Sequence, residues 1–160
     1  MIKRELAEVR KKVVRLESLV NKLQNPDPTA GSIEAENQVR ALIVDDDTDV
    51  RQFLCHLCEF EGYKDIEAER GREALICIEE GRADLMFLDL NLRGGSGVEL
   101  LRILRRRGLD IPTIVISGYV SAETTQQLLE LGVDRIVAKP FNTSRILGEV
   151  RKALGIENVL

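Results

Sequence analysis

The strongest constraint on the fold is an alternation, repeated five times, of a short aliphatic run with a segment of helical periodicity. Several of the runs are rich in isoleucine, valine and leucine, which is typical of strands covered on both faces. Parallel strands need crossover connections, and helices supply them. The pattern therefore predicts an α/β fold with a parallel, doubly wound sheet. The predicted strands span residues 40–44, 65–68, 84–88, 113–116 and 135–138.

The segments between and after these strands repeat aliphatic residues at helical spacing. A glycine stands just after each of the first four, where a left-handed residue closes the last turn of a helix. The predicted helices span residues 49–61, 72–80, 97–107, 122–131 and 143–154, and the closing glycines are Gly62, Gly81, Gly108 and Gly132.

The N-terminal segment has a different pattern, a heptad seam in which aliphatic residues recur at alternating spacings of four and three. Pro26 and Pro28 end this helix, because the residue before a proline is pushed out of the helical region. The chain is thus divided into a coiled-coil helix (1–24), a linker (25–38) and a globular domain (39–157). The seam consists of Ile2, Leu6, Val9, Val13, Leu16, Val20 and Leu23.

The seam predicts a parallel, two-stranded homodimer through residues 2–24. β-Branched residues occupy two of the three a positions and leucine two of the d positions, a combination that favours two strands. Glu5 at g then faces Arg10 at e of the partner helix, and Lys12 faces Glu17. Two alternatives stay open: the helix packs on its own globular domain, or it pairs with the coil of a partner protein.

Charge and cysteine content exclude several functions. Residues 1–24 carry a net charge of +4 and the remainder −8, so the globular domain is a poor ligand for nucleic acid. The longest aliphatic runs are far too short to cross a bilayer, and the N-terminus is not a signal peptide, which predicts a cytoplasmic protein. Cys55, Cys58 and Cys77 are expected to be thiols, and the Cys-X-X-Cys pair lacks a second pair to complete a zinc site.

Polar residues directly follow four of the predicted strands. Ligands of open parallel sheets bind at the carboxyl ends of the strands, so these residues are expected to share one site. Each has an ordinary explanation alone: an acidic residue caps a helix, a serine forms a turn, and a lysine is solvated. Their joint occurrence favours a functional site. The set comprises Asp45, Asp46, Asp47, Asp89, Asn91, Ser117, Gly118, Lys139 and Pro140.

The chemistry of this set points to phosphoryl transfer. Clustered carboxylates raise one another's pKa unless a cation intervenes, and an all-oxygen cluster suits Mg²⁺. Lys139 adds a fixed positive charge. A carboxylate between Mg²⁺ and a lysine can attack a phosphoryl group, because both cations offset charge on the transferring oxygens.

Five short motifs resemble the receiver domains of two-component response regulators. They are Ala-Leu-Ile-Val-Asp-Asp-Asp (41–47), Leu-Asp-Leu-Asn-Leu (88–92), Gly97, Ile-Ser-Gly (116–118) and Ala-Lys-Pro-Phe (138–141). The resemblance covers about residues 39–155. It implies a flavodoxin-like sheet of order 2-1-3-4-5. It also implies a phospho-acceptor signalling domain and not an enzyme with a separate substrate. The partner of such a domain is a sensor histidine kinase or phosphotransfer protein.

The same resemblance implies a role for each site residue. Asp89 is the phospho-acceptor, and Mg²⁺ binds Asp45, Asp46, Asp89 and the backbone carbonyl of Asn91. The hydroxyl of Ser117 turns toward the phosphoryl group, and Lys139 contacts the phosphoryl group. Gly118 leaves the phosphoryl group accessible, and the Lys139–Pro140 peptide bond is cis.

Two departures from the family pattern stand out. Ile136 occupies the position of a switching tyrosine or phenylalanine, so the usual coupling of hydroxyl to aromatic ring is in question. Residues 93–95, Arg-Gly-Gly, stand where many receivers carry a proline, which predicts a looser loop. The alternatives are an unphosphorylated pseudo-receiver scaffold and an aspartyl-nucleophile phosphatase. The phosphatase is disfavoured because Asn91 replaces its second acid/base aspartate.

Overall fold

The computed structural model describes residues 38–156, together with seven residues of the N-terminal segment. The chain divides into two compact units, Met1–Gln38 and Val39–Leu160. Most of the predicted linker (25–38), the seam residues Ile2 and Leu23, and residue 157 lie outside the described residues. Within the described part, no helix is long and apolar enough to cross a membrane.

The described residues of the N-terminal segment are all helical. The aliphatic ones are exposed, with 43% to 60% of their surface accessible. The other residues of the predicted coiled-coil helix (1–24) lie outside the described set, and pairing between two such helices stays a prediction. The seven residues are Leu6, Val9, Arg10, Lys12, Val13, Leu16 and Val20.

The second unit is built on a five-stranded parallel sheet of order β2-β1-β3-β6-β7. Numbered within this sheet alone, the order is 2-1-3-4-5, which confirms the predicted fold. Each strand begins and ends within one residue of its predicted bounds. The strands are β1 (Arg40–Val44), β2 (Lys64–Ala68), β3 (Leu85–Leu88), β6 (Thr113–Ser117) and β7 (Ile136–Ala138).

Helices connect these strands, and a final helix follows β7. Their bounds also lie within one residue of the predicted ones, because each of the first four ends just before a glycine of positive φ, between 66° and 79°. The helices are α3 (Thr48–Phe60), α4 (Gly71–Glu79), α5 (Gly97–Arg106), α6 (Ala122–Glu130) and α7 (Thr143–Leu154).

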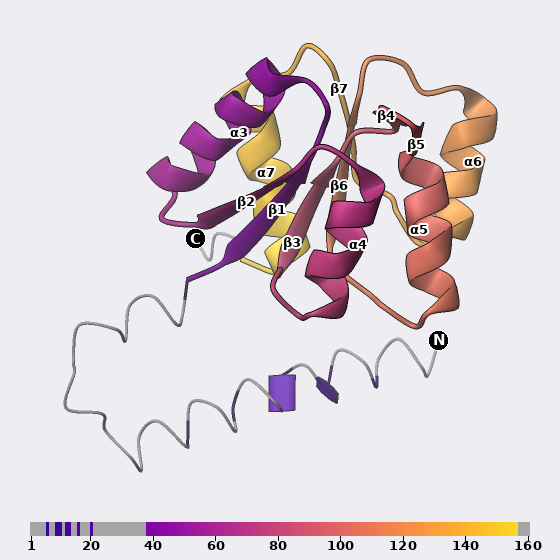
Figure 1. Cartoon of the computed structure of the whole chain (residues 1–160). Coiled ribbons are helices and arrows are strands. Elements are labelled where there is room, and N and C mark those ends of the chain that lie inside the picture. Colours follow the sequence, from indigo (N-terminus) through magenta and orange to yellow (C-terminus); the bar gives the residue numbers. More distant parts are fainter. Residues whose placement is uncertain are drawn as a thin grey trace. The chain divides into compact units, whose positions relative to one another are not determined.

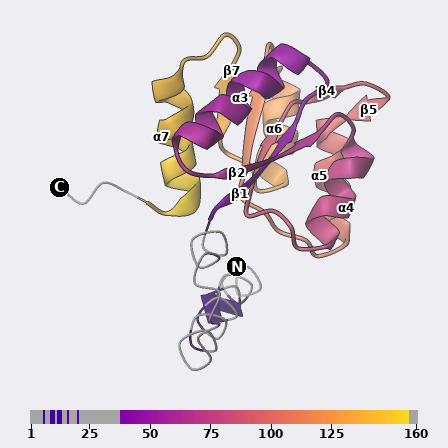
Figure 2. The ribbon, with the colours of Figure 1, turned by 60° about the vertical axis from the view of Figure 1, so that its left-hand side comes forward.

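The helices form a layer on each side of the sheet. α3 and α7 cover one face, and α4, α5 and α6 cover the other (Figure 1). Figure 2, turned to bring the left side forward, shows α3 and α7 next to each other on their common face. Side chains alternate along β1: Leu42 and Val44 pack toward α4–α6, whereas Ala41 and Ile43 pack toward α3 and α7. The aliphatic runs are therefore buried on both faces.

The loop after β3 contains a short hairpin that the sequence did not predict. A looser loop was expected at residues 93–95, but the chain forms a short antiparallel hairpin there. Its strands are β4 (Asn91–Leu92) and β5 (Gly95–Ser96), and Gly94 in the turn has a φ of 78°. A turn that needs a positive φ is readily made by glycine, which suits Gly94 to this hairpin.

Candidate functional site

The acidic residues that follow β1 and β3 meet at the carboxyl edge of the sheet. The strand order reverses between these two neighbouring strands, which is where open parallel sheets bind ligands. Asp45 and Asp89 are buried, whereas Asp46 is more open to solvent. Carboxylate oxygens of the three residues lie within 4.8 Å of one another. The structure thus brings together three of the four acidic residues that the sequence singled out.

Lys139 reaches this cluster from the end of β7. Its Nζ atom donates to Oδ2 of Asp45 at 3.2 Å and to Oδ2 of Asp89 at 3.1 Å. The Lys139–Pro140 peptide bond is cis, as the resemblance implied. The ammonium therefore lies between two buried carboxylates that come from different strands.

Burial and charge shift the pKa values of two groups in the cluster. Burial raises the pKa of Asp45, and the nearby charge of Asp89 raises it further, although the backbone N–H of Asp47 and the ammonium of Lys139 oppose the shift. Burial lowers the pKa of Lys139, but attraction to Asp45 and hydrogen bonds to Asp89 and Asp45 outweigh it, so the net shift is upward. The ammonium is therefore firmly charged, while Asp45 holds its negative charge less readily than an exposed aspartate.

Asp47, the fourth acidic residue, serves as a helix cap. Its carboxylate accepts hydrogen bonds from the backbone N–H groups of Asp49 and Val50 and begins α3. Its own N–H donates to Oδ1 of Asp45 at 2.9 Å. The ordinary explanation for an acidic residue after a strand holds here for Asp47.

Asn91, Ser117 and Gly118 lie around the cluster. The backbone N–H of Asn91 donates to Oδ1 of Asp89 at 3.1 Å, which orients the carboxylate. The hydroxyl of Ser117, at the end of β6, donates to the carbonyl of Tyr119 at 3.3 Å, a long bond. A Cβ atom added to Gly118 would meet no atom within 4 Å, so the space beside this residue is open.

Gly97, the first residue of α5, is pressed against the loop that carries Asp89. A Cβ atom at position 97 would lie 2.5 Å from the carbonyl oxygen of Asp89 and 2.9 Å from Cα of Leu90. The N–H of Gly97 also donates to the carbonyl of Leu90 at 2.9 Å. The sequence showed Gly97 only as part of a family motif, and the packing explains why a side chain is excluded.

Gly97→Ala is expected to lower the free energy of unfolding by about 1–3 kcal/mol, because the added methyl group displaces backbone atoms in a packed region. Urea unfolding followed by circular dichroism measures the change. Gly95→Ala is the matched control, since a Cβ atom there meets nothing within 4 Å. Equal stability of the Gly97 and Gly95 variants would show that the loop carrying Asp89 moves to accept the methyl group without loss of stability.

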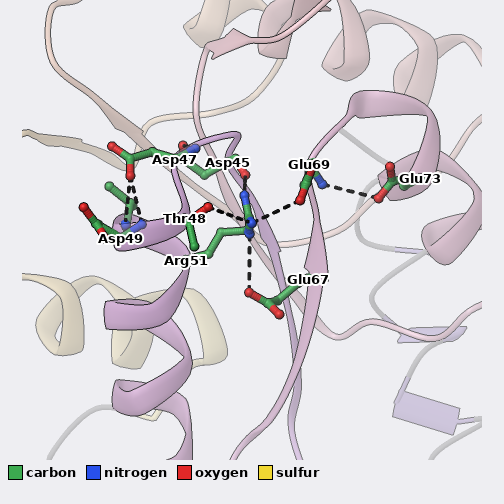
Figure 3. A network of polar contacts seen from close by, with 9 residues as sticks. Asp45, Asp47, Thr48, Asp49, Arg51, Glu67, Glu69 and Glu73 are labelled. Carbon is green, nitrogen blue, oxygen red and sulfur yellow. Dashed lines mark hydrogen bonds and ion pairs between the residues drawn. The ribbon is translucent and has the colours of Figure 1, made fainter.

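Arg51 is a buried charge near the site that the sequence analysis missed. It lies on α3 with 8% of its side chain exposed, and it donates to the backbone carbonyl of Asp45 (Figure 3). The signal was present in the helical spacing, because position 51 shares a buried stripe with Leu54 and Cys58. A charged residue at a position of this kind indicates partners that hydrogen-bond or pair with its charge.

The chain matches the model of the response regulator receiver domain family over residues 41–151. It is 36% identical over 115 residues to the phosphate regulon transcriptional regulatory protein PhoB of Pseudomonas aeruginosa, covering 71% of this chain and 50% of PhoB. It is 32% identical over 119 residues to sporulation initiation phosphotransferase F of Bacillus subtilis, covering 74% and 96%. Among solved structures, a CheY-like receiver domain protein of Methanospirillum hungatei has a TM-score of 0.69 and 32% identity, covering 74% and 95%.

The chain therefore belongs to the response regulator receiver domain family. Receiver domains are the phospho-acceptor signalling domains of two-component systems, they interact with histidine kinases or phosphotransfer proteins, and they generally bind Mg²⁺ at an acidic pocket. The match confirms the resemblance drawn from the five motifs. The comparisons do not favour the phosphatase or the scaffold over this function. The chain spans about half the length of the PhoB proteins that it matches.

Proposed function

We propose that this receiver accepts a phosphoryl group on Asp89 from the phosphohistidine of a sensor histidine kinase or phosphotransfer protein. The observation that carries the proposal is the ammonium of Lys139, which lies between the carboxylates of Asp45 and Asp89 at 3.2 and 3.1 Å. A buried carboxylate beside a fixed positive charge is suited to attack a phosphoryl group, because the cation offsets charge on the transferring oxygens.

The reaction needs no general base, because a carboxylate attacks without giving up a proton. An oxygen of Asp89 forms a bond to phosphorus while the P–N bond of phosphohistidine breaks, and the electron pair leaves with the imidazole. Water later attacks the same phosphorus, which releases inorganic phosphate and restores the carboxylate. The receiver promotes only these reactions on itself and signals through the change of conformation between them.

The acidic cluster fits Mg²⁺ as the metal of this reaction. Its donors are carboxylate oxygens that lie within 4.8 Å of one another, and hard oxygen ligands suit this ion. We assign Asp45, Asp46, Asp89 and the backbone carbonyl of Asn91 as the ligands. When bound, Mg²⁺ would offset the negative charge of the phosphoryl oxygens.

The other residues act on the phosphoryl group from the protein side. Lys139 would bind a phosphoryl oxygen with the ammonium that now contacts Asp89. The hydroxyl of Ser117 would turn from the carbonyl of Tyr119 toward another phosphoryl oxygen, since its present bond is long. Gly118 leaves this side of the site open to the donor.

The test of this function uses phosphoramidate, a small donor with a P–N bond, together with Mg²⁺. Intact-mass spectrometry is expected to show the addition of a phosphoryl group that is stable in acid and removed by alkali, as an acyl phosphate is. Continuous hydrolysis of a small phosphate ester without any labelled protein would instead support the phosphatase alternative.

Asp46→Ala is expected to raise the Mg²⁺ dissociation constant by more than about tenfold, because even partners outside the metal's own ligand set commonly contribute that much. Mg²⁺ titration of the amide resonances, without any phosphodonor, measures the change. Asp47→Ala is the matched control: it removes the α3 cap next in sequence and is expected to retain the affinity. Loss of binding in the Asp47 variant alone would move the site to that residue.

We further propose a three-part organisation in which residues 1–24 form a coiled coil between two copies of the chain, residues 25–38 form a linker, and residues 39–157 form the receiver. The exposed aliphatic residues of the N-terminal segment support the first part, because they are available to a partner helix. The division of the chain between Gln38 and Val39 supports the boundary.

A cytoplasmic location forms part of the proposal, since two-component phosphotransfer takes place there. Cys55, Cys58 and Cys77 are free thiols, as expected in a reducing compartment. Burial raises the pKa of both Cys55 and Cys58 to about 12, which disfavours the thiolate form at neutral pH. The acidic receiver is not expected to bind nucleic acid directly.

A further inference from the structure

We infer that Arg51 is a positioning residue of the Mg²⁺ site: it holds the peptide carbonyl between Asp45 and Asp46 and thereby directs both carboxylates. This inference rests on the proposed metal site. Nη1 of Arg51 donates to that carbonyl at 2.7 Å, in a buried hydrogen bond. The contact is with the backbone that joins the two proposed ligands, so any movement of the arginine is transmitted to both of them.

The carbonyl of Asp45 lies beyond the last hydrogen bond between β1 and β2. The ladder between β1 and β2 ends with the pair Val44 and Ala68, and the N–H of Asp45 donates to the carbonyl of Ala68 just beyond it. The carbonyl of Asp45 follows this last bond, and a buried carbonyl needs a donor. Arg51, the fourth residue of α3, supplies the donor.

The guanidinium is itself held by side chains of three segments (Figure 3). Its Nε donates to Glu67 on β2 at 3.3 Å, and its Nη2 donates to Glu69 at 3.2 Å and to Thr48 at 3.4 Å. Arg51 is buried, whereas 49% and 63% of the two glutamate side chains are exposed. A planar group with donors fixed in several directions resists rotation, so the carbonyl is held in one orientation.

A purely electrostatic effect of Arg51 on Mg²⁺ affinity would be opposite in direction to a positioning effect. Its positive charge repels Mg²⁺, so removal of the charge alone would strengthen metal binding. A positioning role predicts weaker binding, because the two carboxylates lose their common anchor. The direction of the change in Mg²⁺ affinity therefore separates the two effects, and it does not depend on phosphorylation.

The test measures the Mg²⁺ dissociation constant of the full chain by titration of amide resonances with magnesium chloride. Arg51→Met is expected to raise the constant about tenfold. Arg51→Lys, which keeps the charge but loses the rigid fork of donors, is expected to raise it as well. If the methionine variant fails to fold, as seen from its amide dispersion, the lysine variant decides.

Arg40→Gln is the matched control. Arg40 lies at the other end of β1 and pairs through Nε and Nη2 with Asp84, so its loss is expected to lower stability and leave Mg²⁺ affinity unchanged. Unchanged or tighter binding in the Arg51 variants, or equal weakening in the Arg40 variant, overturns the inference. If the unmodified protein binds no Mg²⁺, or if Asp46→Ala binds it equally well, the proposed metal site is wrong, and the positioning role of Arg51 is wrong with it.

Discussion

Replacement of Asp89 by asparagine is expected to abolish labelling of the protein by phosphoramidate and Mg²⁺. The side chain keeps its size, but an amide does not act as the nucleophile that an ionised carboxylate is. Asp89 is buried, accepts a hydrogen bond from the N–H of Asn91 and contacts the ammonium of Lys139. The residue is thus oriented by both neighbours, and we expect none of the surrounding carboxylates to replace it.

The measurement is the fraction of phosphorylated chain by intact-mass spectrometry after a fixed time. Asp47→Asn is the matched control, because asparagine caps a helix as well as aspartate does, and this variant is expected to label like the unmodified protein. Equal labelling of the Asp89 variant would show that another residue is the acceptor. Loss of labelling in the Asp47 variant would place the acceptor, or its metal, nearer the start of α3.

Removal of residues 1–31 is expected to convert a dimer into a monomer. The helical aliphatic residues Leu6, Val13 and Val20 at a, with Val9 and Leu16 at d, are all about half exposed, and a second helix of the same kind would cover them. Light scattering at tens of micromolar should give twice the mass of one chain for the intact protein. A form that starts near residue 32 should give the mass of a single chain.

A point variant tests the same interface in the full chain. Val13→Asp places a charge in the predicted seam and is expected to yield a monomer, whereas Ser18→Asp, at the outward-facing f position of the heptads, should remain dimeric. A monomeric intact protein would show that the seam does not pair two copies of the chain. The seam would then pair with the coil of a partner protein or pack on its own receiver. A shortened form that still dimerises would transfer the interface to the receiver.

The sequence by itself determined the fold class and nearly every boundary of the receiver, whereas the sheet order was implied by the resemblance to a known family. Its aliphatic runs are too short for helices and uninterrupted enough for buried strands, and positive-φ glycines such as Gly62 and Gly81 end the helices where expected. These features are local, because periodicity and turn chemistry depend on residues close together in the chain. The hairpin at β4 and β5 was missed, since two-residue strands have no periodicity to detect.

The sequence also identified which residues could form the site, because strands of a parallel sheet bring their carboxyl ends to one edge. Position after a strand alone did not distinguish the three consecutive aspartates, and only the family resemblance assigned Asp45 and Asp46 to the metal. Asp45 is buried and faces Lys139, Asp46 is a more open member of the cluster, and Asp47 caps α3. These three roles depend on where the chain turns after β1.

Only the tertiary structure decided the contacts between residues that are distant in sequence. Lys139 meets Asp45 across 94 positions of the chain, and Arg51 meets Glu69 across 18. The exclusion of a side chain at Gly97 likewise arises from the close approach of the start of α5 to the loop after β3. Distances of this kind are set by the packing of helices on a twisted sheet, and local sequence carries no record of them.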